Sequence, residues 1–80
     1  MQPIKVVGAL WCEDTLRTLE HLQEINAPFE FFNVDEDPDA KQWCIEQNGG
    51  KQVTPTLDVG GTILVEPSNE ELDEAIETAG

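Results

Sequence analysis

The chain has 80 residues, and its 4 basic and 17 acidic side chains give a formal charge of −13 at neutral pH. This charge excludes a nucleic-acid-binding protein, because phosphates are held by clustered lysine and arginine side chains. The same shortage of cations argues against docking on an anionic membrane surface. The sequence contains neither an apolar run long enough for a membrane span nor a secretory signal pattern. We therefore expect one soluble, cytoplasmic domain over residues 1–80, with two cysteines that stay reduced.

The first third of the chain predicts a strand followed by a helix. Residues 4–9 form a short β-branched apolar run, which is typical of a strand buried on both faces. In the next segment, apolar residues recur at helical spacing, and residues 26–28 (Asn-Ala-Pro) end the pattern. The predicted apolar stripe of this helix consists of Leu16, Leu19, Leu22 and Ile25.

A second strand and a second helix follow. Residues 29–34 are rich in aromatic side chains and predict a strand. Asp37 and Pro38 supply an N-cap and a first-turn proline for a helix that residues 48–50 (Asn-Gly-Gly) end. The residues expected on one face of this helix are Ala40, Trp43, Cys44 and Gln47.

The last third of the chain predicts a hairpin and a third helix. The strands at residues 56–59 and 62–65 are separated by Gly60 and Gly61, which is a strong two-residue turn signal. Ser68 and Glu71 have the spacing of a capping box and predict a helix start. Its apolar positions are Leu72, Ala75, Ile76 and Ala79.

The predicted order is therefore β-α-β-α-β-β-α. Because β-α-β crossovers are right-handed, the first two strands run parallel, and the hairpin adds antiparallel strands. The fold class is α/β, with a four-stranded mixed sheet flanked by three helices. This order resembles the thioredoxin fold at the length of a glutaredoxin.

Cys12 lies where the first strand gives way to the first helix. Unpaired N–H groups and the helix dipole stabilise a thiolate at such a position and lower the pKa of the thiol. The end of a strand in an α/β sheet is also where ligand crevices open. Position alone is equally consistent with a small, buried, unreactive cysteine.

Two sequence motifs support a reactive role for Cys12 beyond its position. The segment Trp11-Cys12-Glu13-Asp14-Thr15 resembles the W-C-x-x-C loop of thioredoxins and glutaredoxins, with threonine in place of the second cysteine. The segment Val53-Thr54-Pro55-Thr56 resembles the part of that superfamily that carries a cis proline. Taken alone, this second segment is also compatible with an ordinary X-Pro turn at the start of a strand.

The resemblance extends over essentially the whole chain. Residues 48–56, 60–62 and 66–68 are similar to the N-G-G-x-x-x-x-P-T, D-G-x and P-S run of bacterial glutaredoxin-like proteins of the mycoredoxin type. It implies a thiol–disulfide oxidoreductase with no tightly bound cofactor and no metal, and with glutathione or a similar low-molecular-weight thiol as co-substrate. Its partners would be that thiol and thiol or disulfide client proteins, and the protein would be a monomer.

The resemblance also assigns roles to individual residues. Cys12 is the expected nucleophile, and Thr15 cannot close a disulfide with it, so the implied cycle is a monothiol one. Thr15 is expected to donate a hydrogen bond to the Cys12 thiolate. The residues expected to bind the thiol are Trp11, Gln52, Thr54, Pro55, Ser68 and Asn69.

Departures from the family pattern keep two alternatives open. Glu13 and Asp14 oppose ionisation of Cys12, and together with Thr15 they favour a non-catalytic or weakly active binding module. Glutaredoxins usually carry a basic residue shortly before the active cysteine, but Ala9 and Leu10 occupy that stretch here, so Lys51 is the only cation expected near the site. An iron–sulfur carrier is disfavoured, because residues 12–15 are not the C-G-F-S sequence of that branch.

Two further residues are interpreted as structural. Cys44 is expected to pack in the core on the opposite side of the sheet from the Cys12 helix, too far away to be a resolving thiol. His21, the only histidine, is expected to be a solvated helix residue.

Overall fold

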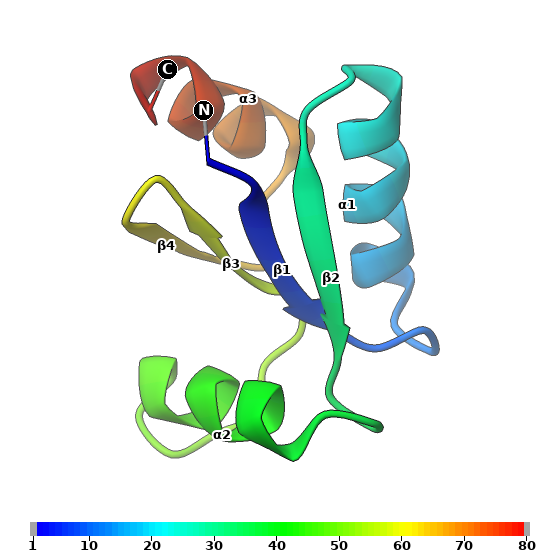
Figure 1. The fold of residues 1–80 in the computed structure, drawn as a ribbon, viewed down its shortest axis with the longest axis vertical. Coiled ribbons are helices and arrows are strands. Elements are labelled where there is room, and N and C mark those ends of the chain that lie inside the picture. Colours follow the sequence, from blue (N-terminus) through cyan, green and yellow to red (C-terminus); the bar gives the residue numbers. More distant parts are fainter. Residues whose placement is uncertain (1, 80) are drawn as a thin grey trace.

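The computed structural model describes residues 2–79 and confirms the predicted order of elements (Figure 1). Within these residues the strands are β1 (Ile4–Gly8), β2 (Phe29–Asn33), β3 (Thr56–Val59) and β4 (Thr62–Val65). The helices are α1 (Glu13–Glu24), α2 (Pro38–Gln47) and α3 (Asn69–Ala79). Over the same residues, no helix is both long enough and apolar enough to cross a bilayer.

The strands form a mixed sheet in the order β2-β1-β3-β4. β1 pairs in parallel with β2, so that Val6 lies opposite Phe31. β3 pairs antiparallel with both β1 and β4. The predicted topology, with a parallel pair joined by a helical crossover and an antiparallel hairpin, is confirmed.

Each face of the sheet has its own apolar cluster. Because side chains alternate along a strand, Val6 and Val7 of β1 point to opposite faces. Val6 packs with Leu22 of α1 and Leu72 of α3, whereas Val7 packs with Cys44 of α2. α1 and α3 therefore cover one face, and α2 covers the other (Figure 1).

The predicted apolar stripe of α1 is partly wrong. Leu22 is buried, but Leu16 and Ile25 are exposed. Thr15 and Thr18 are buried in their place. Hydropathy favours burial of leucine, because its transfer from water to an apolar interior is favourable. The turn of α1 that contains Thr15, however, lies so close to the backbone of β1 that a larger side chain does not fit there. In α2, the predicted face is correct for Ala40, Trp43 and Cys44, whereas Gln47 is exposed.

The predicted helix caps are confirmed. The Asp37 side chain accepts hydrogen bonds from the backbone N–H groups of Asp39 and Ala40. At α3, Ser68 Oγ accepts from the N–H of Glu71, and Glu71 Oε1 accepts from the N–H of Ser68. These side chains satisfy N–H groups that the first turn of a helix leaves without partners.

His21 differs from its prediction. It is half-buried, and its Nε2 atom lies 2.6 Å from Asp73 Oδ1, so it joins α1 to α3. The two helices are neighbours only in the tertiary structure, which is why the sequence did not reveal this contact.

Candidate active site

Cys12 is the N-cap residue of α1, as predicted from the change between strand and helix. Its backbone is extended, with φ −94° and ψ 115°. Its N–H donates to the Ala9 carbonyl, and its own carbonyl accepts from the N–H of Leu16. The side chain is half-exposed and lies at the edge of the cluster formed with α2. The sulfur is therefore placed at a helix N-terminus without being enclosed in the core.

The surroundings of Cys12 lower the pKa of its thiol. Partial burial raises the pKa of Cys12, but hydrogen bonds from the side chains of Thr54 and Thr15 and from the backbone of Thr15 and Asp14 lower it further than burial raises it. One contact acts in the opposite direction: the thiol donates to the Thr54 carbonyl at 3.5 Å, and only the neutral thiol makes this bond. The balance favours the thiolate, which is the nucleophilic form.

Thr15 is fully buried beneath Cys12 and contacts β1. Its hydroxyl oxygen accepts a hydrogen bond from the N–H of Ala9 at 3.4 Å, which leaves its proton free to be donated. A side chain at Gly8 would bring its Cβ within 2.6 Å of Thr15. The glycine therefore lets this part of α1 approach the strand, and Thr15 is held against the end of β1, one turn after Cys12.

Replacing Thr15 by valine is expected to reduce the fraction of Cys12 present as thiolate at neutral pH. The change keeps the side-chain shape but removes the hydroxyl donor, and a hydrogen bond of this kind contributes about 1 kcal/mol, or roughly fivefold in an equilibrium. The pKa of Cys12 then rises, so the pH dependence of its alkylation moves to higher pH. Thiolate absorbance in the ultraviolet, followed as a function of pH, measures this shift.

Thr18→Val is the matched control for this prediction. Thr18 is also fully buried in α1, but its hydroxyl has no hydrogen-bond partner among residues 2–79. Its replacement is expected to leave the titration of Cys12 unchanged. An equal shift in both variants would contradict a specific role for the Thr15 hydroxyl.

The segment 53–56 carries Thr54 to the sulfur, and the Thr54–Pro55 peptide bond is cis. Thr56 Oγ1 donates to the Val53 carbonyl at 2.7 Å, and Asn48 Nδ2 donates to Thr56 Oγ1 at 3.0 Å. The Pro55 carbonyl accepts from the N–H of Glu66 at 2.9 Å. This network holds the segment beside Cys12. Sequence reasoning missed the role of Asn48, which was interpreted only as part of a helix end.

Trp11 and Gln52 flank this centre on the surface. The Trp11 side chain is 66% exposed, and its Nε1 donates to Asp35 Oδ2 at 2.9 Å, so the ring is anchored to the loop after β2. Gln52 is exposed in the loop two residues before Thr54. Their predicted contact with a bound thiol stays a prediction.

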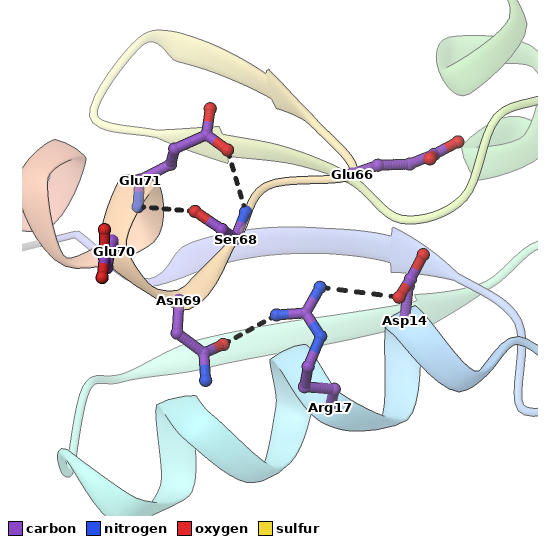
Figure 2. Close-up of a pocket in the computed structure, with 7 residues that line it drawn as sticks. All are labelled: Asp14, Arg17, Glu66, Ser68, Asn69, Glu70 and Glu71. Carbon is purple, nitrogen blue, oxygen red and sulfur yellow. Dashed lines mark hydrogen bonds and ion pairs between the residues drawn. The ribbon is translucent and has the colours of Figure 1, made fainter.

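Ser68 and Asn69, the other two predicted thiol-binding residues, lie at a cavity of about 660 Å³ between the starts of α1 and α3 (Figure 2). We call it the α1–α3 cavity. Its lining residues are Asp14, Arg17, Glu66, Ser68, Asn69, Glu70 and Glu71. The cavity connects Asp14, whose backbone contacts Cys12, with the N-terminus of the last helix.

Arg17 was not identified from the sequence, and the expectation that Lys51 is the only cation near the site is wrong. Arg17 Nη1 donates to Asn69 Oδ1 at 2.7 Å (Figure 2). Arg17 Nη2 donates to the Pro67 carbonyl at 3.0 Å. Nη2 also lies 3.6 Å from Asp14 Oδ1. The i, i+3 spacing of Asp14 and Arg17 was the available signal, because it places both on one helix face.

Cys44 has no exposed surface, and its thiol donates to the Val53 carbonyl at 3.1 Å. It belongs to the cluster beneath α2, on the face of the sheet opposite α1, as predicted. A disulfide in solvent cannot reach this sulfur in the observed conformation. In the part of the chain that the structure describes, no group of three or more histidine, cysteine or acidic side chains could hold a metal ion.

Comparison with known proteins places this geometry in a family. A protein-family model described as Glutaredoxin matches residues 4–64. The thioredoxin-like protein BC3987 is 24% identical, with a TM-score of 0.80 over 90% of this chain and 97% of that one. The glutaredoxin (grx-1) from Archaeoglobus fulgidus is also 24% identical, with a TM-score of 0.77 over 95% and 87% of the two chains. No curated protein sequence matches the chain.

The two structural neighbours confirm the predicted thioredoxin-like fold. The family match supports a thiol–disulfide oxidoreductase type of function at the level of the family. The matched segment includes both the Cys12 loop and the Thr54–Pro55 bond, so the fold and the site are consistent with the same family. The chain belongs to the glutaredoxin family.

Proposed function

We propose that the protein catalyses thiol–disulfide exchange with Cys12 as its only reacting thiol. The observation that carries this proposal is the position of the half-exposed Cys12 thiol at the N-cap of α1, 3.5 Å from the Thr54 carbonyl. The lowered pKa of the thiol at this position supports it. The position three residues later, where a second cysteine would lie on the same helix face, is occupied by Thr15. Since Cys44 is buried behind the sheet, a single-thiol cycle is the one that fits.

The cycle has two exchange steps. The Cys12 thiolate attacks one sulfur of a disulfide, a new S–S bond forms at Cys12, and the other sulfur leaves as a thiolate that takes up a proton. A second thiol molecule, a low-molecular-weight thiol such as glutathione, then attacks the Cys12 mixed disulfide. In this step one S–S bond forms between the two small thiols, the S–S bond at Cys12 breaks, and the Cys12 thiolate is regenerated.

The surrounding groups would position the substrate. The backbone of Thr54 beside Pro55 provides an edge on which an extended thiol compound or peptide can pair. Trp11 and Gln52 would line this groove, and Ser68 and Asn69 would contact the far end of the thiol. The two reduced cysteines fit a cytoplasmic location for this activity.

A neutral disulfide tests the proposal. Incubation with bis(2-hydroxyethyl) disulfide is expected to add one mercaptoethanol group to Cys12 and none to Cys44, as found by peptide mapping and mass spectrometry. The adduct is expected to disappear when a reduced low-molecular-weight thiol is added. A folded protein that forms no adduct would instead be a binding module, and an adduct on Cys44 alone would refute the assignment of the nucleophile.

A further inference from the structure

The charged side chains around Cys12 indicate which disulfides react with it most readily. This inference rests on the proposed exchange activity and concerns its substrate. Glu13 and Asp14 directly follow the nucleophile, and Glu66 lies next to the 53–56 segment, since its N–H donates to the Pro55 carbonyl. Further carboxylates of Glu70 and Glu71 border the α1–α3 cavity (Figure 2).

The α1–α3 cavity offers few free donors to an anion. Arg17 is the only basic side chain that lines it among the described residues, and its guanidinium already binds Asn69, Pro67 and Asp14. The N–H groups of Ser68 and Glu71 are used within the capping box. An incoming carboxylate would therefore meet mainly negative charge, whereas an ammonium or guanidinium group would find several acceptor oxygens.

The surface beside Cys12 also carries exposed apolar side chains. Trp11, the residue next to Cys12, is 66% exposed, and Leu10 and Leu16, which lie within four positions of Cys12 in the sequence, are exposed too. Exposed apolar and above all aromatic side chains are typical of surfaces that bind other proteins. This feature favours a polypeptide over a small thiol as the partner that brings the disulfide.

We propose that the preferred substrate of Cys12 is a cysteine disulfide in a basic polypeptide segment. The peptide backbone pairs beside Thr54, its apolar side chains contact Trp11, and a nearby lysine or arginine enters the α1–α3 cavity toward Asp14 and Glu66. The chain's charge of −13 steers such a partner to the protein and repels anionic disulfides. Exchange follows the two steps given above, with the peptide sulfur joined to Cys12.

The test uses peptides that differ at one position. Three peptides carry lysine, glutamine or glutamate two residues from their cysteine, and each is supplied as its mixed disulfide with 2-mercaptoethanol. Mass spectrometry gives the rate of peptide transfer to Cys12. This rate is divided by the rate at which an uncharged thiol, N-acetylcysteine amide, attacks the same mixed disulfide, which corrects for the intrinsic reactivity of each peptide. At about 0.01 M salt the lysine peptide is expected to react roughly three- to tenfold faster than the glutamate peptide. At about 1 M salt this ratio is expected to approach one.

Two variants locate the effect. Glu66→Gln is expected to lower the lysine-to-glutamate rate ratio by about twofold. Glu77→Gln removes the same charge near the other end of α3, roughly 12 Å along the helix axis from Asn69, and is expected to preserve the ratio. A ratio near one in the unmodified protein at low salt, or an equal fall in both variants, would overturn the inference.

The glutamine peptide separates the two levels of the proposal. If it reacts at Cys12 while the charge of the peptide makes no difference, only the substrate inference fails. If neither the three peptides nor bis(2-hydroxyethyl) disulfide reacts with a folded protein, the proposed exchange activity itself is refuted.

Discussion

Cys12→Ser is expected to reduce the rate of disulfide exchange to that of the uncatalysed reaction. A serine hydroxyl is not ionised near neutral pH and does not attack a disulfide, so no covalent intermediate forms. Cys12 lies only at the edge of the cluster beneath α2, and serine is close to cysteine in size, so the fold is expected to survive the change. Turnover of a mixed disulfide, coupled to a reduced low-molecular-weight thiol, measures the loss, and circular dichroism checks the fold.

Cys44→Ser is the matched variant, because it removes the other thiol. Serine retains a donor for the Val53 carbonyl, and we expect exchange to persist with a loss of stability of about 1 kcal/mol. If Cys44→Ser abolished turnover in a protein with unchanged circular dichroism, the single-thiol cycle would be wrong and Cys44 would be a second reacting thiol.

Leu22→Ala is expected to lower the free energy of unfolding by about 2–5 kcal/mol. Leu22 of α1 is fully buried in the cluster that α1 and α3 form with one face of the sheet, so truncation removes apolar contacts and leaves a cavity. A domain of this size is stabilised by only about 0.05–0.15 kcal/mol per residue, so the loss is a large part of the total. Urea unfolding, followed by tryptophan fluorescence, gives the change in midpoint.

Leu16→Ala makes the same chemical change on the same helix. Leu16 is 46% exposed, and surface substitutions of this kind change stability by less than about 0.5 kcal/mol. Equal losses in the two leucine variants would contradict the observed orientation of α1, and would restore the stripe predicted from the sequence.

The order of elements was predictable because its signals are local. Asp37 with Pro38, Ser68 with Glu71, and the glycine pair at 60–61 act within a few residues, and their hydrogen bonds or positive φ angles appear where expected. Both strands of the hairpin have their predicted bounds. Such signals satisfy backbone groups or set backbone angles without any help from distant segments.

The position of Cys12 was also predictable, for the same reason. Because it lies between a strand and a helix, Cys12 is the N-cap residue of α1, and the residues that follow it form the first turn, whose N–H groups lack helical partners. The family resemblance added the role of Thr54 and Pro55, which lie far away in the sequence.

What the sequence determined by itself was therefore the fold, the helix caps and the position of Cys12 at the start of α1. Tertiary structure alone decided that α1 buries Thr15 and Thr18, that Arg17 binds the start of α3, and that Glu66 lies beside the cis peptide bond. Hydropathy ranks side chains by their transfer from water, but the space between two packed elements depends on backbones that are distant in the chain. For this reason a small threonine lies beneath the cysteine, while a leucine next to it faces solvent.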